Sequence, residues 1–287
     1  MKAIVIGANG QLGSDLADVF RTGGFQVLAM THSDIEVEQI DSVKKVLTTF
    51  QPEIVLNTAA YHVVPQCEKE PDRAYAVNSL GAFNIARVCE EIGASTIYFS
   101  TDYVFDGLKG QPYIEEDKPN PLNVYAVTKL AGEYFTLNYC TGGTVARVSG
   151  IYGEVPCRAK GGNFITTMLK LAREKPEVRV VNDEILTPTP TREIAKKTLE
   201  LARGGLRGLF HLTCEGECSW YEFAEVIFEE RRLTTPLSPC SAAEMPPSVQ
   251  RPSYSVLENG RLAASGLLPM PHWKDALVSF LRDTAAP

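Results

Sequence analysis

The sequence predicts an α/β fold with a doubly wound parallel sheet and a smaller C-terminal lobe. In the first half of the chain, short apolar runs alternate with amphipathic stretches, and this strand-then-helix rhythm is typical of parallel sheets. A glycine-rich segment, Gly7 to Gly13, lies between the first apolar run and the first amphipathic stretch. A strand, a glycine turn and a helix in this order indicate a sheet of the Rossmann type.

Short apolar runs bounded by turn residues predict the strands. They cover residues 3–6, 26–30, 53–57, 95–100, 144–148, 178–181 and 208–212. Apolar residues at helical spacing predict the helices, with Asp41 as the N-cap of the second and Pro52 behind its end. They cover residues 11–22, 41–50, 71–92, 121–139, 164–174, 191–203, 220–230 and 273–282.

The rhythm loosens after residue 152, and residues 234–252 are rich in Pro and Ser. Such a segment is either a surface excursion or part of a small lobe that covers a ligand. We therefore expect a Rossmann domain over residues 1–150 and mainly a substrate-binding lobe over residues 151–287. Segments near residues 178–212 are expected to return to the first domain.

Composition excludes several classes of protein. The 287 residues carry 28 Lys and Arg against 35 Asp and Glu, without a strongly basic run, so a nucleic-acid partner is not expected. No apolar run approaches the ~20 residues of a membrane span, and the first is too short for a signal peptide, so we expect a cytoplasmic protein. The seven scattered cysteines predict free thiols and no metal site. The sequence leaves open whether the protein forms a homodimer.

The glycine segment predicts a dinucleotide site. Glycines there allow a tight turn, a close approach of the backbone to a pyrophosphate, and close packing of the helix on the strand. The free N–H groups of the helix N-terminus favour an anion. The alternative is a plain structural turn. The candidate cofactor-binding residues are Gly7, Asn9, Gly10, Gln11, Leu12 and Gly13.

The residues after the second strand bear on the choice of cofactor. A dinucleotide fold that prefers NAD usually places an Asp or Glu there for the ribose 2′-hydroxyl. Here the strand ends in Ala-Met-Thr-His-Ser, residues 29–33, without a carboxylate and without Arg or Lys. Thr31 could therefore contact the ribose of either NADPH or NADH; alternatively, Thr31 and Ser33 only begin a turn.

A tyrosine and a lysine four positions apart predict the reactive group. Tyr125 and Lys129 share one face of the expected helix, after a strand that ends in Ser100-Thr101. We expect the ammonium to lower the pKa of the phenol toward neutrality and to make it a general acid. The alternative is an exposed aromatic ring beside a solvated lysine.

These motifs carry a resemblance to the extended short-chain dehydrogenase/reductases, and within them to the dTDP-4-dehydrorhamnose reductase family. It extends over nearly the whole chain. The resembling segments are Gly7 to Gly13, Asn57 to Tyr61, Ser100 to Gly107, Pro121 to Tyr125 with Thr128-Lys129, Gly162 to Phe164, Val181 to Asp183, Ser219 to Ala224 and Arg251-Pro252. The resemblance implies a seven-stranded parallel sheet that binds NADPH or NADH, and a lobe for a nucleotide-linked sugar.

The resemblance also implies roles for single residues. Tyr125, Lys129 and Thr101 are the expected catalytic residues: the phenol gives a proton, the lysine holds the ribose, and the threonine bonds the carbonyl oxygen. Further cofactor contacts are expected from Ala59, Ala60, Tyr61 and Asn78. Substrate contacts are expected from Thr101, Asp102, Tyr103 and Asn163.

The chain departs from the family pattern at Pro65, Ala126 and Gly150, the last in place of an aromatic residue near the sugar. The expected reaction is the reduction of the C4 keto group of a nucleotide-linked 4-keto-6-deoxy sugar. One alternative is an epimerase or dehydratase of the same superfamily, for which Asp102 is the obvious additional acid or base. The other is a non-catalytic, reductase-like regulatory subunit.

Overall fold

A computed structural model describes residues 1–157, 159, 161–246 and 249–284. A six-stranded parallel sheet forms the centre of its larger part, in the order β10-β5-β4-β3-β1-β2. The α/β class and the parallel sheet are confirmed. The strands are β1 (Lys2–Ile6), β2 (Gln26–Met30), β3 (Ile54–Asn57), β4 (Ser95–Thr101), β5 (Gly143–Val148) and β10 (Gly208–His211).

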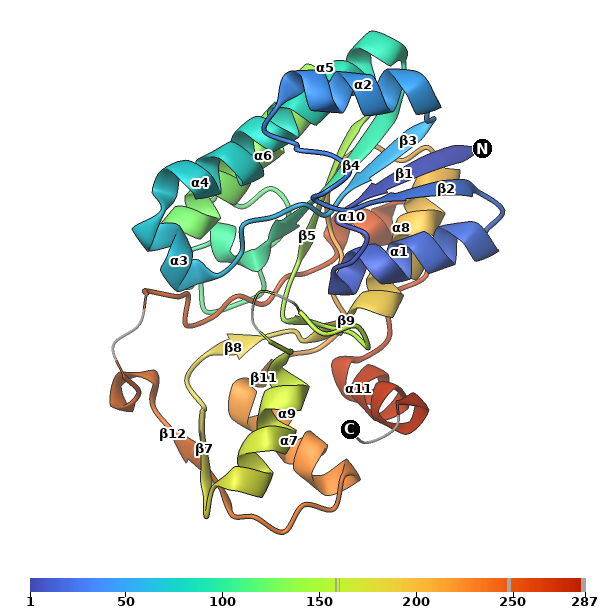
Figure 1. The fold of residues 1–287 in the computed structure, drawn as a ribbon. Coiled ribbons are helices and arrows are strands. Elements are labelled where there is room, and N and C mark those ends of the chain that lie inside the picture. The colour runs from blue at the N-terminus through green and yellow to red at the C-terminus, as the bar shows by residue number, and fades with distance from the viewer. Residues whose placement is uncertain (158, 160, 247–248, 285–287) are drawn as a thin grey trace.

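Helices cover both faces of this sheet (Figure 1). One face carries α2, α5 and α6, and the other carries α1 and α8. Apolar side chains such as Leu16, Phe20 and Leu56 are fully buried between these layers, which excludes water from both faces of the sheet. The helices are α1 (Gln11–Thr22), α2 (Ile40–Phe50), α5 (Gly81–Ile92), α6 (Val124–Tyr139) and α8 (Thr191–Arg203).

The chain direction creates a switch point between β1 and β3. From β1 the chain crosses to β2 on one side, and then returns to β3 on the other side of β1. Loops at the carboxyl ends of strands next to such a point diverge and leave room for a ligand. The glycine segment follows β1, and the segment from Thr58 follows β3, so both begin at this point.

The expected seventh strand is absent from the main sheet of the described residues. Glu115 occupies the outer side of β10: its Oε1 accepts the His211 amide at 3.0 Å and the Arg261 amide at 3.2 Å. The short helix α10 (Gly260–Ala264) packs against the same strand. A carboxylate and a helix therefore cover the edge that another strand would need.

Most expected elements appear at their predicted positions, and α1, β2, α7, β7, α8 and α9 agree to the residue. The expected helix 71–92 consists of α4 (Pro71–Tyr75), a π-helical turn over Ala76–Leu80, and α5. Helix α6 begins at Val124 rather than at residue 121 because the Asn123 side chain caps it. The cap of α2 is Gln39, and Asp41 lies in its first turn. Helix α3 (Val64–Lys69) was not expected.

The smaller part has its own core, with α7, α9 and α11 around the buried Phe223 and Tyr152 (Figure 1). Strand β12 comes from the Pro- and Ser-rich segment and pairs in parallel with β7, so this segment is part of the lobe. The elements are α7 (Phe164–Glu174), α9 (Trp220–Glu230), α11 (Trp273–Asp283), β7 (Val178–Val181), β12 (Leu237–Cys240), β8 (Ile185–Leu186) and β11 (Cys218–Ser219).

The chain moves between the two parts more than once. After β7 and β8, helix α8 packs against α1 and β10 joins the main sheet. A two-residue parallel pair, β6 (Ile151–Tyr152) with β9 (Thr189–Pro190), lies where the chain leaves and re-enters the larger part. The division near residue 150 stays a prediction.

Close packing of α1 on the glycine turn gives a first test of the fold. A Cβ atom at Gly13 would lie 2.2 Å from the Gly7 carbonyl oxygen and 2.7 Å from its carbon. Because both are backbone atoms of a tight turn, Gly13→Ala should destabilise the protein by about 1–3 kcal/mol, the usual cost of overpacking. Thermal unfolding should show a lower Tm.

The control is Gly204→Ala at the end of α8, where the nearest atoms lie 3.4 Å from the new Cβ and φ is −76°. Its Tm should stay close to that of the unchanged protein. An equal Tm for Gly13→Ala would show that the turn relaxes and that this packing does not constrain the fold.

Candidate active site

The glycine segment makes a tight turn at the switch point. Gly7 has a φ of +81°, and the amides of Gly7 and Ala8 both donate to the Met30 carbonyl, at 2.9 and 3.0 Å. A Cβ at Gly7 would lie 2.5 Å from the Thr58 hydroxyl oxygen, so the loops after β1 and β3 are in close contact here. Leu12 is buried in the core below α1, and Asn9 is half-buried in the loop.

The N-terminus of α1 is open and suits an anion. Gly10 is its N-cap, no side chain caps the helix, and its first turn contains no acidic residue. A Cβ at Gly10 would meet only the Gly7 carbonyl oxygen, at 3.3 Å, so packing within the protein does not fill the space above the loop. The Gln11 Nε2 atom is buried without a hydrogen-bond partner among the described residues. Free amides, a helix dipole and space at Gly10 fit a dinucleotide diphosphate.

Asn78 organises the loop after β3. Its Oδ1 accepts the Tyr61 amide at 2.8 Å, and its Nδ2 donates to the Tyr61 carbonyl at 2.9 Å and to the Thr128 hydroxyl at 3.0 Å. Asn78 is fully buried in the π-helical turn. Ala59 is held by the Asn57 side chain, and Ala60 accepts from His62. Of the four residues expected to contact the cofactor, Ala59, Ala60 and Tyr61 therefore lie in one loop beside the glycine turn, and Asn78 anchors this loop through Tyr61.

The end of β2 carries a carboxylate that the motif comparison missed. Asp34 folds back so that its Oδ2 accepts the Thr31 amide at 2.8 Å and the Thr31 hydroxyl at 2.6 Å. The Thr31 bonds hold the pKa of this carboxyl below its usual value, so Asp34 is charged at neutral pH. Thr31 and Ser33 do belong to a turn, and their hydroxyls lie 2.8 Å apart. The expectation of no negative charge at this position was wrong.

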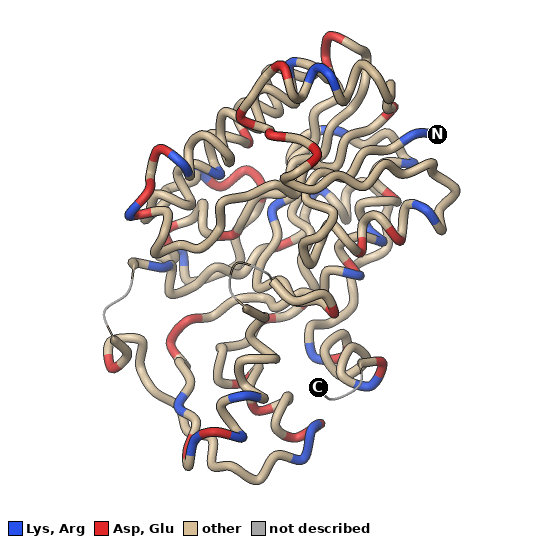
Figure 2. Tube along the Cα trace, viewed as in Figure 1, with Lys and Arg blue, Asp and Glu red and all other residues tan. Residues whose placement is uncertain are grey.

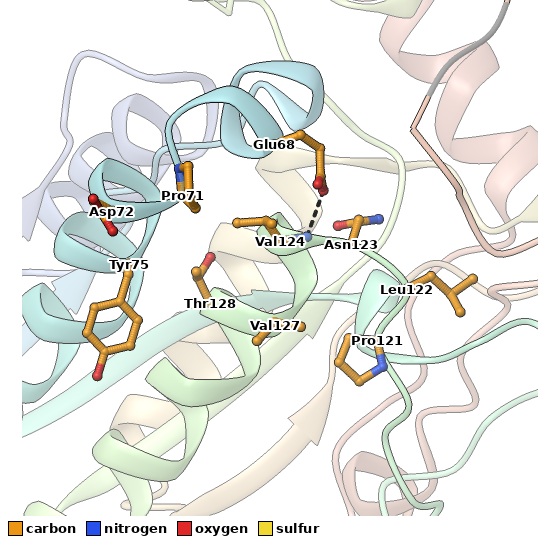
Figure 3. Close-up of a pocket in the computed structure, with 10 residues that line it drawn as sticks. All are labelled: Glu68, Pro71, Asp72, Tyr75, Pro121, Leu122, Asn123, Val124, Val127 and Thr128. Atoms are coloured by element: carbon orange, nitrogen blue, oxygen red, sulfur yellow. Dashed lines mark hydrogen bonds between the residues drawn. The ribbon is translucent and has the colours of Figure 1, made fainter.

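The side chains of Asn123 and Glu68 fix the start of α6, the helix that carries Tyr125. Asn123 Oδ1 accepts the Ala126 amide at 2.9 Å, and Glu68 Oε1 accepts the Val124 amide at 2.8 Å (Figure 3). Glu68 belongs to α3 and lies in a groove of about 560 Å³ beside α3, α4 and the start of α6. Thr101, Tyr125 and Lys129 are not among the residues that line this groove.

The three expected catalytic residues come together where β4 ends beside α6. The hydroxyl of Thr101, the last residue of β4, lies close enough to the Tyr125 phenol to lower its pKa. Lys129 is 2% exposed and donates from Nζ to the Phe99 carbonyl at 2.6 Å. Its ammonium also lies 4.0 Å from the centre of the Tyr98 ring. Lys129 therefore points at β4, one helical turn beyond Tyr125.

The direction of the Tyr125 pKa differs from the expectation. Burial raises the pKa of Tyr125, and the hydrogen bond with Thr101 counteracts only part of the rise. Burial also lowers the pKa of Lys129 to about 7, against the opposing charge of Glu133. The expected lowering of the Tyr125 pKa by Lys129 was wrong, because desolvation of the phenol is the largest effect and raises this pKa.

Asp102 is buried and its carboxylate is fully engaged. Its Oδ2 accepts the hydroxyls of Ser149 at 2.9 Å and Ser255 at 2.5 Å, and its Oδ1 accepts the Thr101 hydroxyl at 3.0 Å. Desolvation raises the pKa of Asp102, while the three hydroxyl bonds oppose the rise. Ser149 follows β5 and Ser255 belongs to the C-terminal segment, so this carboxylate connects three distant parts of the chain.

The expected substrate residues have different surroundings. The Tyr103 ring lies edge-on to Tyr125 with 6.2 Å between ring centres, and charges on Arg251 and Glu184 affect its phenol. Asn163 lies in the smaller part of the molecule and caps α7: its Oδ1 accepts the Thr166 amide at 3.0 Å. Its Nδ2 donates to the Gly153 carbonyl at 3.0 Å, so both ends of its side chain have structural partners.

The structure also explains why residue 150 is a glycine. Its φ is +52°, and a Cβ there would lie 2.8 Å from the Leu186 side chain and 3.0 Å from the Pro188 backbone. Leu186 and Pro188 therefore occupy the space that a side chain at residue 150 would need, and the local backbone favours glycine rather than the aromatic residue that the resemblance implies.

Three features of the described residues bear on other classes of site. No three His, Cys, Asp or Glu side chains among them form a group that could hold a metal ion. In the same part of the chain, no helix has the length and apolar character needed to cross a membrane. Basic and acidic residues are interspersed along the trace in both parts of the molecule (Figure 2).

Comparisons with known proteins agree with this geometry. The family model described as the RmlD substrate binding domain matches residues 1–286. The spore coat polysaccharide biosynthesis protein SpsK of Bacillus subtilis is 39% identical over 99% of this chain and 98% of its own. The dTDP-4-dehydrorhamnose reductase of Mycolicibacterium smegmatis is 34% identical over 96% of this chain and 84% of its own.

A solved structure shows the same similarity in three dimensions. The dTDP-4-dehydrorhamnose reductase of Bacillus anthracis, in complex with NADP, is 35% identical and superimposes with a TM-score of 0.94 over 99% of both chains. The family model and the two curated relatives each cover nearly the whole of this chain. The chain therefore belongs to the dTDP-4-dehydrorhamnose reductase family.

Proposed function

We propose that this protein reduces the C4 keto group of a nucleotide-linked 4-keto-6-deoxy sugar, dTDP-4-dehydrorhamnose, to give dTDP-rhamnose. The observation that carries this is the joining of Thr101, Tyr125 and Lys129 at the end of β4, beside an open glycine loop. The names of the relatives support the same substrate, and SpsK supports a place in polysaccharide precursor synthesis. NADPH or NADH, when bound, supplies the hydride.

The remaining steps, which are dinucleotide binding and proton transfer, would be carried out by residues of this chain. The free amides at the N-terminus of α1 hold the diphosphate where the Gly7 to Gly13 segment leaves room for it, and the loop with Ala59, Ala60 and Tyr61, anchored by Asn78, lines the same site. Tyr125 gives its proton to the oxygen that gains charge as the carbonyl is reduced. Lys129 holds the ribose and offers a positive charge beside Tyr125.

Thr101 has a more restricted role than the resemblance implies. Its single hydroxyl proton is donated to Asp102. A bond from Thr101 to the substrate oxygen therefore requires this proton to turn away from Asp102. The proposed role of Thr101 is therefore to act on the Tyr125 phenol, with Asp102 holding the Thr101 hydroxyl in place.

The surroundings of Asp102 argue against the epimerase or dehydratase alternative. An additional acid or base must reach the substrate, but this carboxylate is 3% exposed and holds three hydroxyls. The regulatory-subunit alternative is disfavoured because the buried contacts of Tyr125 and Lys129 are intact. Of the residues expected to contact the sugar nucleotide, we propose direct contacts from Thr101, Tyr103 and Asn163, and the Tyr103 ring lies 6.2 Å from the Tyr125 ring. The fourth, Asp102, contributes through Thr101 rather than by touching the substrate.

Three expectations from the sequence stay predictions: a cytoplasmic location, a homodimer, and the absence of a nucleic-acid partner. They do not affect the proposed reaction.

The proposed function is tested by following the absorbance of NADH and NADPH with dTDP-4-dehydrorhamnose as substrate. Oxidation that depends on the sugar nucleotide supports the reductase. Conversion of a sugar nucleotide without net oxidation of the dinucleotide would support the epimerase or dehydratase instead. Dinucleotide binding without turnover of any 4-keto sugar nucleotide would support the regulatory subunit.

Tyr125→Phe removes the proton donor and leaves the ring. Its kcat should fall by a factor of ~10²–10⁴, the usual contribution of general acid catalysis, while dinucleotide binding is largely kept. Tyr134→Phe on the same helix is the control, because this ring is 58% exposed. Turnover of Tyr125→Phe above half of the unchanged rate would exclude the phenol as the acid.

Gly10→Val places a side chain where the diphosphate would lie. The described structure offers a Cβ there only one near contact, at 3.3 Å, so the variant should fold. We expect the loss of dinucleotide binding, measured by titration of cofactor fluorescence, with a Tm close to that of the unchanged protein. Unchanged affinity would mean that the loop is only a structural turn.

Asp34→Asn tests the cofactor preference. Both NADH and NADPH should be used, but the charged Asp34 carboxylate beside Thr31 repels a 2′-phosphate. Removing the charge should raise the ratio of kcat/KM for NADPH to that for NADH by roughly three- to tenfold, an effect that salt weakens because Asp34 is exposed. Asp275→Asn on α11 is the control. A ratio that changes less than twofold would place the ribose elsewhere.

A further inference from the structure

One face of α6 carries a third ionisable residue. Tyr125, Lys129 and Glu133 follow one another at intervals of four residues, so their side chains lie on the same face of the helix. Glu133 is 3% exposed. A carboxyl group is rarely buried to this extent unless it is paired, and the sequence motifs assign it no role.

The three side chains bind to three successive residues of β4. Lys129 Nζ donates to the Phe99 carbonyl at 2.6 Å. Ser100 Oγ donates to Glu133 Oε1 at 2.5 Å. The Thr101 hydroxyl acts on the Tyr125 phenol and lowers its pKa. Glu133 is therefore tied to the same stretch of β4 as the reactive pair.

Arg147, on β5, holds the Glu133 carboxylate from the other side. Its Nε donates to Oε1 at 2.9 Å and its terminal nitrogen to Oε2 at 2.7 Å, a two-point contact that fixes the plane of the carboxylate. Arg147 itself is 2% exposed, with its guanidinium 5.0 Å from the centre of the Phe105 ring. The negative charge of Glu133 is thus held in one place.

Among the described residues, the other groups that face Lys129 supply no negative charge. The Phe99 carbonyl and the Tyr98 ring are its immediate partners, and burial raises the pKa values of Tyr98 and Tyr125, which stay neutral. His211, beside Arg147, is also neutral because burial lowers its pKa to about 3.

The charged groups near Lys129 are then few. Arg147 is positive, and Asp102 lies beyond Thr101 and acts on Tyr125. Glu133 is the charge that counteracts the desolvation of Lys129, whose pKa burial lowers to about 7.

We propose that Glu133 is a positioning residue of this site: anchored by Ser100 and Arg147, its carboxylate keeps the buried Lys129 ammonium charged beside Tyr125. The proposal rests on the proposed function, because the task of Lys129 belongs to it. Glu133 does not touch the substrate or the dinucleotide in this account. It acts through Lys129 alone.

The first experiment measures the alkaline limb of kcat/KM with NADPH for the unchanged enzyme and for Glu133→Gln. Because kcat/KM reports the ionisation of the free enzyme, loss of the Lys129 charge should appear as a fall in kcat/KM with rising pH. Removal of the carboxylate should lower the midpoint of this limb by roughly one pH unit. Glu133→Asp keeps the negative charge, so its midpoint should lie close to that of the unchanged enzyme.

Glu133→Gln leaves Arg147 buried without its partner and can fail to fold. A second pair of variants leaves no buried cation unpaired: Arg147→Met, in which Ser100 still donates to Glu133, and Arg147→Met combined with Glu133→Gln. The double variant has no unpaired buried charge at these two positions. Its midpoint should again lie roughly one pH unit below that of Arg147→Met. The control is Glu200→Gln, which removes a carboxylate bonded to the buried Lys197 far from the site and should leave the midpoint unchanged.

The titration of Lys129 itself separates this proposal from the proposed function. ¹⁵N NMR of lysine-labelled protein, with the Lys129 signal assigned by its loss in Lys129→Met, gives the midpoint without any turnover. A lower midpoint in the Glu133→Gln variants supports the role of Glu133 even if no reductase activity is found. Midpoints that agree within 0.3 pH unit, with only the Tm reduced, would overturn it and leave Glu133 a purely structural partner of Arg147.

Discussion

The contact between α6 and the carboxyl end of β4 is the constraint on which the rest of the site depends. Three successive β4 residues, Phe99 to Thr101, bind three side chains on one face of the helix. Their spacing fixes where the phenol and the ammonium lie relative to the edge of the sheet. Because this contact is buried, a charge there costs free energy. The site therefore needs the paired Glu133 and Arg147 to keep the buried Lys129 charged.

The same edge of the sheet also connects the larger part to the smaller one. Asp102 follows β4 directly and binds Ser255 from the C-terminal segment, and Gly107 accepts a hydrogen bond from Ser253 at 3.3 Å. Strands β7 and β12, far apart in sequence, pair with each other within the lobe. The proposed reacting groups therefore lie on the main sheet and α6, and the returning chain brings the charge of Arg251 near Tyr103.

The sequence predicts features that depend on local pattern. The ranges of α1, β2 and α8 and the turn at Gly7 follow from periodicity and from glycine geometry, which neighbours in sequence determine. It does not predict Asp34 at Thr31, because this carboxylate lies four positions beyond the end of β2. Nor does it predict the Glu133–Arg147 pair or the burial of Asp102, which depend on contacts between different elements of the fold. The Tyr125 pKa was misjudged for the same reason, since desolvation is a property of the whole fold.

The central claim is that this site transfers a hydride to C4 of a sugar nucleotide. The most direct measurement uses NADPH with deuterium at C4 of the nicotinamide, dTDP-4-dehydrorhamnose as substrate, and NMR with mass spectrometry of the product. The account predicts dTDP-rhamnose with one deuterium at sugar C4 and one dinucleotide oxidised for each sugar reduced. A product without deuterium at C4, or exchange of solvent hydrogen into another ring carbon without net oxidation of NADPH, would contradict it.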